Sequence, residues 1–135
     1  KAAIVDAAYA DTLSALVADI SAVLDSAEPA DRPAAYIRTM VRHFREHPSS
    51  VRMITEAMRS GDADHERKER WGPLAAIIDE AAAVHGAGDV RARDLAVIVG
   101  GAIDGIVIEQ LEDPAYDSAA AAERLVTMLE SMIAR

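Results

Sequence analysis

The chain has 135 residues and a net charge of −9, contains no cysteine, and is 51% hydrophobic with heavy use of alanine. These values allow one domain with its own core, exclude disulfides and thiolate zinc sites, and disfavour direct contact with a phosphate backbone. An aromatic content of only 4%, combined with abundant alanine, favours packed helices over sheet.

The first half of the chain is predicted to form three helices. Apolar residues keep helical spacing over 2–26, which predicts a long amphipathic helix. The segment 27–33 is a turn, and the helix that follows it should end at His47, because the residue before a proline is biased away from helix. Pro48 then begins a short helix that is broken at 60–64.

The second half predicts three more helices. One begins near Pro73 and ends at a glycine C-cap, either Gly86 or Gly88. Two others are expected over about 91–112 and 117–134. The predicted fold is therefore a single all-α domain, an antiparallel bundle of about six helices joined by short loops.

The predicted helix over 91–112 carries three glycines, although glycine costs a helix interior about 1 kcal/mol relative to alanine. Gly101 and Gly105 are four residues apart and share one face, where small residues permit close approach of another backbone. Close packing inside the subunit is one interpretation, and a seam between two copies of the chain is the other. Because this helix and the last one are apolar nearly all round, we expect the last two helices to form an intermolecular four-helix bundle. The residues expected at this interface are Ile98, Gly101, Asp104, Gly105, Ile108, Leu111, Leu125, Met128, Leu129 and Met132.

The stretch "HGAGDVRARDLAVIVGGAIDGIVIEQLEDP" resembles the C-terminal half of the tetracycline-repressor (TetR) family of bacterial regulators. In that family a helix ends in glycine, an arginine and an aspartate follow, and a dimerisation helix then ends near an Asp-Gly-apolar step. The matching positions here are Gly88, Arg91, Asp94 and "IDGIV" (103–107).

Two further segments fit the same resemblance. "REHPSSVRMITEAM" (45–58) is similar to the His-Pro helix start of this domain, and Lys1 begins a segment similar to the one that follows the family's DNA-binding headpiece. The resemblance implies that residues 1–135 are a ligand-binding and homodimerisation domain, with a helix-turn-helix headpiece expected upstream of residue 1. It also implies a small hydrophobic effector and operator DNA contacted only through that headpiece. We expect a cytoplasmic location and no cofactor. No membrane segment is expected, because Asp104 and the glycines interrupt the longest apolar run.

A sensor of this type should hold an apolar cavity between its helices. Trp71, in "WGP", lies where a helix break can leave room, although it could equally be an aromatic residue that caps the surface. Any other candidate could be an ordinary core residue. The candidate ligand-binding residues are Tyr36, Met40, His43, Phe44, Met53, Ile54, Met58, Trp71, Leu74 and Ile78.

"HFREH" matches the pattern H-x-x-E-H of inverted zinc proteases. In that interpretation His43 and His47 would face one metal and Glu46 would act as base, giving a helical metal-binding protein or enzyme. We do not expect this metal site, because His47 adjoins Pro48 and no downstream acidic ligand is apparent. No nucleophilic serine elbow or phosphate-binding glycine loop is present, so an enzyme is not expected. A dimerisation module without a ligand is the remaining alternative.

Overall fold

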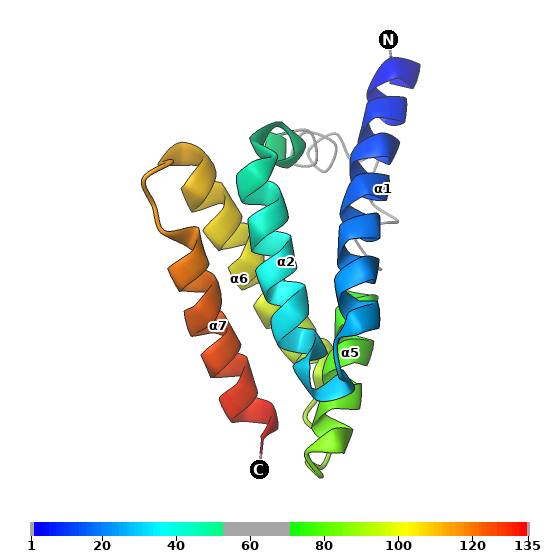
Figure 1. Ribbon diagram of the computed structural model, residues 1–135, viewed down its shortest axis with the longest axis vertical. Coiled ribbons are helices and arrows are strands. Elements are labelled where there is room, and N and C mark those ends of the chain that lie inside the picture. The colour runs from blue at the N-terminus through cyan, green and yellow to red at the C-terminus, as the bar shows by residue number, and fades with distance from the viewer. Residues whose placement is uncertain (1, 53–70, 135) are drawn as a thin grey trace.

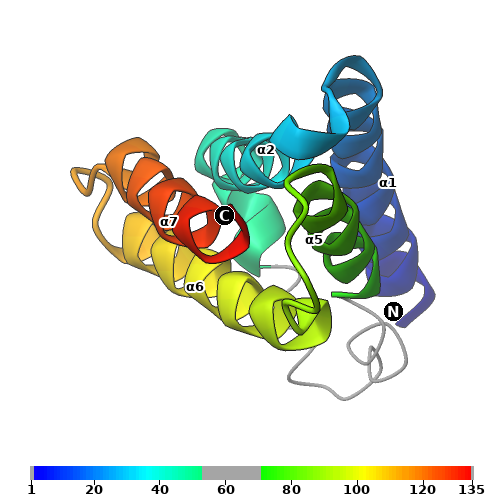
Figure 2. The same ribbon diagram turned by 90° about the horizontal axis from the view of Figure 1, so that it is seen from below.

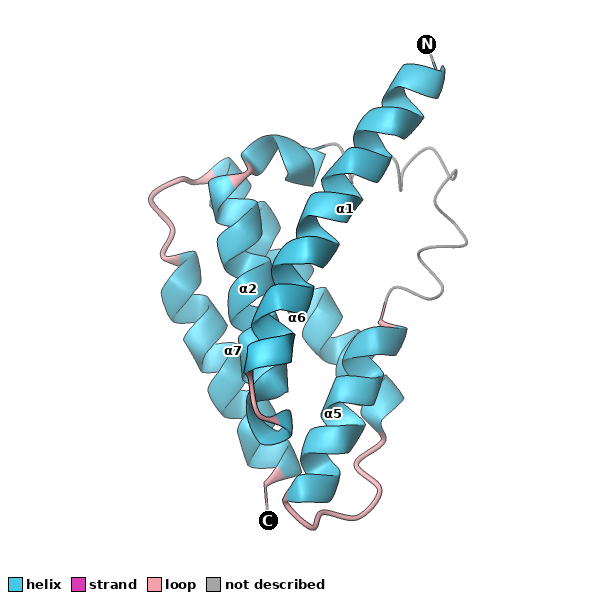
Figure 3. Ribbon diagram, turned by 45° about the vertical axis from the view of Figure 1, so that its right-hand side comes forward, coloured by secondary structure: helices cyan, strands magenta, loops and turns pink. Residues whose placement is uncertain are grey.

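The computed structural model describes residues 2–52 and 71–134, and every regular element within them is a helix. The elements are α1 (Ala2–Ser26), the short 3-10 helix η1 (Pro29–Asp31), α2 (Arg32–Glu46), α5 (Gly72–Val84), α6 (Ala92–Glu112) and α7 (Ser118–Ile133). Residues 48–52 are also helical. The predicted all-α class is thus confirmed, with no strand in the described ranges (Figure 3). No described helix is both long and apolar enough to cross a membrane.

Helix α2 is the centre of the bundle. The long helices α1, α2, α5, α6 and α7 alternate in direction along the chain (Figure 1). Seen along the bundle, α1 and α5 lie to one side of α2, while α6 and α7 lie side by side on the other (Figure 2). Because α2 packs against all four of these helices, it contributes to the core along its whole length. The fully buried large side chains include Ile37, Leu74, Ile78, Ile103 and Ile133.

Local sequence signals explain where the helices end. Helix α2 ends at His47, immediately before Pro48, as the sequence predicts. Gly86 follows the C-cap of α5, and its φ of 71° lies in the left-handed region that glycine enters without a steric penalty. The Gly86 amide donates to the Ala83 carbonyl at 3.1 Å and the Ala87 amide to the Ala82 carbonyl at 3.0 Å, which is a Schellman motif. Of the two predicted caps, Gly86 is therefore the one used.

Arg32 closes the turn between α1 and α2. Its Nε donates to the carbonyls of Leu24 and Ala27, each at 3.2 Å, near the end of α1, where helical carbonyls lack intrahelical partners. Its Nη1 also reaches Glu80 of α5 at 2.9 Å. One guanidinium thus ties the end of α1 to α5.

Asp117 caps the N-terminus of α7. Its side-chain oxygen accepts a hydrogen bond from the Ala120 amide at 3.0 Å, which satisfies one of the free donors of the first turn. We expect Asp117→Ala to lower the free energy of unfolding by ~1 kcal/mol. Asp117→Asn keeps a side-chain acceptor and should therefore lower the free energy of unfolding by clearly less. Urea denaturation followed by circular dichroism compares the two, and equal losses would contradict the capping role.

Candidate functional site

Helices α6 and α7 expose a group of large apolar side chains. On α6, the buried residues recur every three or four positions and face the core, so the intervening positions face outward. The exposed residues are 44–63% accessible, and no described side chain covers them. They are Val97, Ile98 and Ile108 on α6, with Met128 and Met132 on α7. A cluster of this kind on one face marks an interaction surface more often than a scattered exposed leucine does.

The three glycines of α6 serve two different purposes. A Cβ built on Gly100 would lie 2.5 Å from the Cδ2 and Cζ2 atoms of the Trp71 indole, so Gly100 makes room for that ring inside the subunit. Gly101 and Gly105 are exposed, and nothing lies within 4 Å of a Cβ built on either. Internal packing therefore accounts for Gly100 alone. The other two lie on the outward side of α6, together with Ile98 and Ile108.

The interface residues expected from sequence divide into two sets in the structure. Leu125 and Leu129 are only 7% and 2% exposed and belong to the subunit core. The subunit core thus already covers these two side chains, whereas Met128 and Met132 are 63% and 59% exposed on the same helix. Ile98, Gly101, Gly105, Ile108, Met128 and Met132 are exposed, while Asp104 and Leu111 are half-buried. We call the six exposed residues the outer face.

The described ligand-binding candidates converge in the core between the helices. Buried apolar candidates from α2 and α5 share one hydrophobic cluster, and Trp71 packs against it with its ring over Gly100. The buried candidates are Tyr36, Met40, His43, Phe44, Leu74 and Ile78. Met53, Ile54 and Met58 lie outside the described residues. The side chains brought together are packed as a core, and among them Phe44 also lines a cavity described below.

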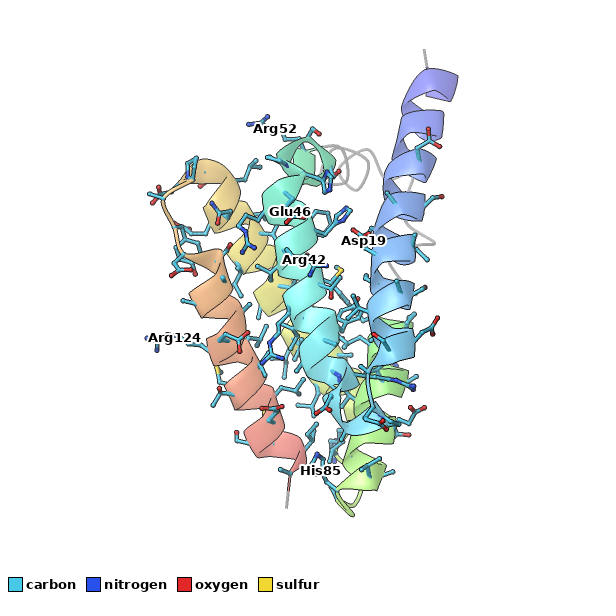
Figure 4. The ribbon with its side chains drawn as sticks, in the orientation of Figure 1. Asp19, Arg42, Glu46, Arg52, His85 and Arg124 are labelled. Carbon is cyan, nitrogen blue, oxygen red and sulfur yellow. The ribbon has the colours of Figure 1, made fainter. Side chains whose placement is uncertain are left out.

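His43 is buried and links α2 to α1. Its side chain is 3% exposed, and Nδ1 lies 2.6 Å from an Asp19 carboxylate oxygen, so the ring N–H donates to that carboxylate. Figure 4 shows Asp19 projecting from α1 toward α2. The His43 and His47 rings are 4.5 Å apart, yet no group of three or more His, Cys, Asp or Glu side chains suited to a metal ion occurs within 2–52 and 71–134.

The Asp19 contact should stabilise the fold measurably. Asp19→Ala leaves a buried imidazole N–H without its acceptor, so we expect the free energy of unfolding to fall by ~1–3 kcal/mol. Asp25→Ala is the matched control, because Asp25 is an exposed carboxylate on the same helix. It should change stability by less than ~0.5 kcal/mol. Equal effects of the two substitutions in urea denaturation would contradict a role for the Asp19–His43 hydrogen bond.

Arginines at helical spacing line a groove between α2 and α7. The groove has a volume of about 190 Å³, and its walls include Arg38, Arg42 and Arg45 of α2. Arg38 pairs with Glu123 through two hydrogen bonds of 2.7 and 2.8 Å. That hydrogen bonding raises the pKa of Arg38 and lowers the pKa of Glu123 from their ordinary values. Both side chains are more than half exposed, so this pair contributes little to stability.

A second cavity, of about 310 Å³, opens where α2 ends near the end of α6. Arg45 and Arg52 line it together with Gln110. The remaining lining residues are apolar: Phe44, Pro48, Val51, Val107, Leu111 and Pro114. We call this cavity the end pocket.

Sequence reasoning missed the cationic residues of these cavities. Arg38, Arg42, Arg45 and Arg52 recur at helical intervals, and that pattern was available in the sequence. The partner of His43 had no such signal, because Asp19 lies 24 residues away on a different helix.

Comparison of the chain with protein-family models, with curated proteins and with solved structures returns no match. The resemblance to the tetracycline-repressor family therefore rests on the sequence motifs alone.

Proposed function

We propose that this chain is the effector-sensing and homodimerisation domain of a bacterial transcriptional regulator of the TetR type. The observation that carries the proposal is the outer face of α6 and α7, which presents large apolar side chains and two glycines that internal packing does not require. The antiparallel α6–α7 pair is one half of a four-helix bundle, and a second copy related by a two-fold axis supplies the other half.

The chemistry of the outer face favours a second copy of the same chain. An isologous interface places each residue against the same surface of its partner, so apolar residues meet apolar residues without a need for complementary charge. The glycines allow the two α6 backbones to approach closely. Full burial of an Ile or Met side chain contributes ~1.5–3 kcal/mol, which gives the association its driving force.

Sensing requires helices that can move relative to this seam. Helix α1 packs on α2 on the side of the bundle away from α6 and α7, and the Asp19–His43 hydrogen bond joins the two. In the proposed mechanism a small hydrophobic ligand between the helices shifts the population between two orientations of α1. A headpiece attached upstream would then fit or fail to fit operator DNA, in the cytoplasm, while the seam stays fixed.

The regulatory half of the proposal is tested on the longer protein that carries a headpiece. Operator affinity is measured by fluorescence anisotropy at one salt concentration with and without bound ligand. We expect the ligand to change the affinity at least ~5-fold, the lower end of ordinary allosteric coupling. A ligand that binds and leaves operator affinity unchanged would overturn the coupling.

A dimerisation module without a ligand is the second candidate. The observation in its favour is that the described residues expected around a ligand are packed as a core, with the Trp71 ring seated on Gly100. The two functions share the seam and differ in ligand binding.

A further inference from the structure

We propose that the end pocket binds a small carboxylate with an apolar body, such as a medium-chain fatty acid. The role of this pocket as the effector site rests on the proposed sensing function. Carboxylate binding by the pocket does not rest on it and is measured separately.

The walls of the end pocket suit an apolar ligand body. Phe44 and Val107 belong to the hydrophobic core, while Val51 and Leu111 come from two different helical segments. Its volume of about 310 Å³ is at the lower end of the range for ligand pockets, ~300–1,000 Å³. The cavity therefore selects a compact molecule rather than a drug-sized one.

The polar groups of the end pocket select an anion. Arg45 and Arg52 have no hydrogen-bond or ion-pair partner among the described residues, unlike Arg38 and Arg32. Figure 4 shows Arg52 at the end of the molecule where α2 gives way to the helical segment 48–52. A guanidinium group matches a carboxylate with two parallel hydrogen bonds, so two arginines at one cavity supply the donors that such a group requires.

Gln110 adds a third polar group, and its orientation is already fixed. Its amide nitrogen donates one N–H to the Pro114 carbonyl at 3.0 Å, and the same NH2 group carries a second N–H donor. Exposed acidic residues occur at the same end of α6, at Glu109, Glu112 and Asp113, and none of them lines the pocket. In a chain of net charge −9, the cavity is therefore a locally cationic site.

The test is a calorimetric titration of the 135-residue chain with octanoate and, separately, with 1-octanol, which has the same carbon chain without the charge. We expect octanoate to bind at least ~10-fold more tightly, because hydrogen bonds to charged groups are the strong ones. The double substitution Arg45→Gln/Arg52→Gln should remove this preference. Arg42→Gln/Arg93→Gln removes the same charge from exposed positions outside the pocket and should preserve it.

Three results would overturn the proposal. They are no detectable octanoate binding at millimolar concentration, equal affinity for octanol, and an unchanged octanoate affinity in the Arg45→Gln/Arg52→Gln variant. Each concerns the pocket alone, because the oligomeric state of the same samples is measured independently and reports on the seam.

Discussion

Arginine at both Gly101 and Gly105 is expected to make the chain monomeric without weakening its fold. Nothing lies within 4 Å of a Cβ at either position, so the subunit can accept the larger side chains. Arginine is also a better helix former than glycine, by nearly 1 kcal/mol per site. In the dimer the same substitutions place four guanidinium groups in an apolar seam. We expect the dimer dissociation constant to rise at least ~100-fold, equivalent to ~3 kcal/mol.

Arginine is chosen because its positive charge cannot drive the chains apart by adding to their net negative charge. Two arginines change the net charge of each chain from −9 to −7, so general repulsion between acidic chains falls rather than rises. Gly72→Arg/Gly88→Arg is the matched control, because these glycines also have open space around a Cβ and lie away from the outer face. Sedimentation equilibrium measures both variants. A Gly101→Arg/Gly105→Arg protein that associates as tightly as its control would contradict the proposed seam.

Gly100→Ala is expected to destabilise the subunit itself, unlike arginine at Gly101 and Gly105. The added Cβ overlaps the Trp71 indole, and such overpacking costs ~1–3 kcal/mol, which exceeds the gain in helix propensity of nearly 1 kcal/mol. We therefore expect a net loss of stability on urea denaturation at a fixed chain concentration, followed by circular dichroism.

The same substitution in a Trp71→Leu protein tests whether the indole ring causes the loss of stability. In a Trp71→Leu protein the large ring is gone, so Gly100→Ala should become neutral or stabilising. The difference between the two backgrounds is the coupling energy of the pair, expected at ~1–3 kcal/mol. The same destabilisation in both backgrounds would show that the ring is not what Gly100 accommodates.

Helix boundaries were predictable because local signals set them. The predicted helices over 2–26, 91–112 and 117–134 agree with α1, α6 and α7 to within one residue at each end. Proline and glycine restrict the backbone wherever they occur, and apolar spacing reports the helical period without knowledge of neighbours.

Which of two adjacent residues faces the core was not predictable in the same way. Gly100 and Gly101 are adjacent and chemically identical, yet one faces Trp71 and the other faces outward. Leu129 and Met128 differ as sharply in burial, although both belong to one apolar helix. Which direction is inside depends on how α6 and α7 pack, and that is a tertiary property with no local sequence signal.

The central claim is that two copies of this chain associate through the outer face of α6 and α7. The most direct measurement is a native mass spectrum of the chain, recorded over a range of concentrations together with a denatured intact mass. The account predicts a principal species at twice the 14.4 kDa of one chain. A chain that stays monomeric at high concentration would contradict the seam, and with it the proposed dimeric regulator.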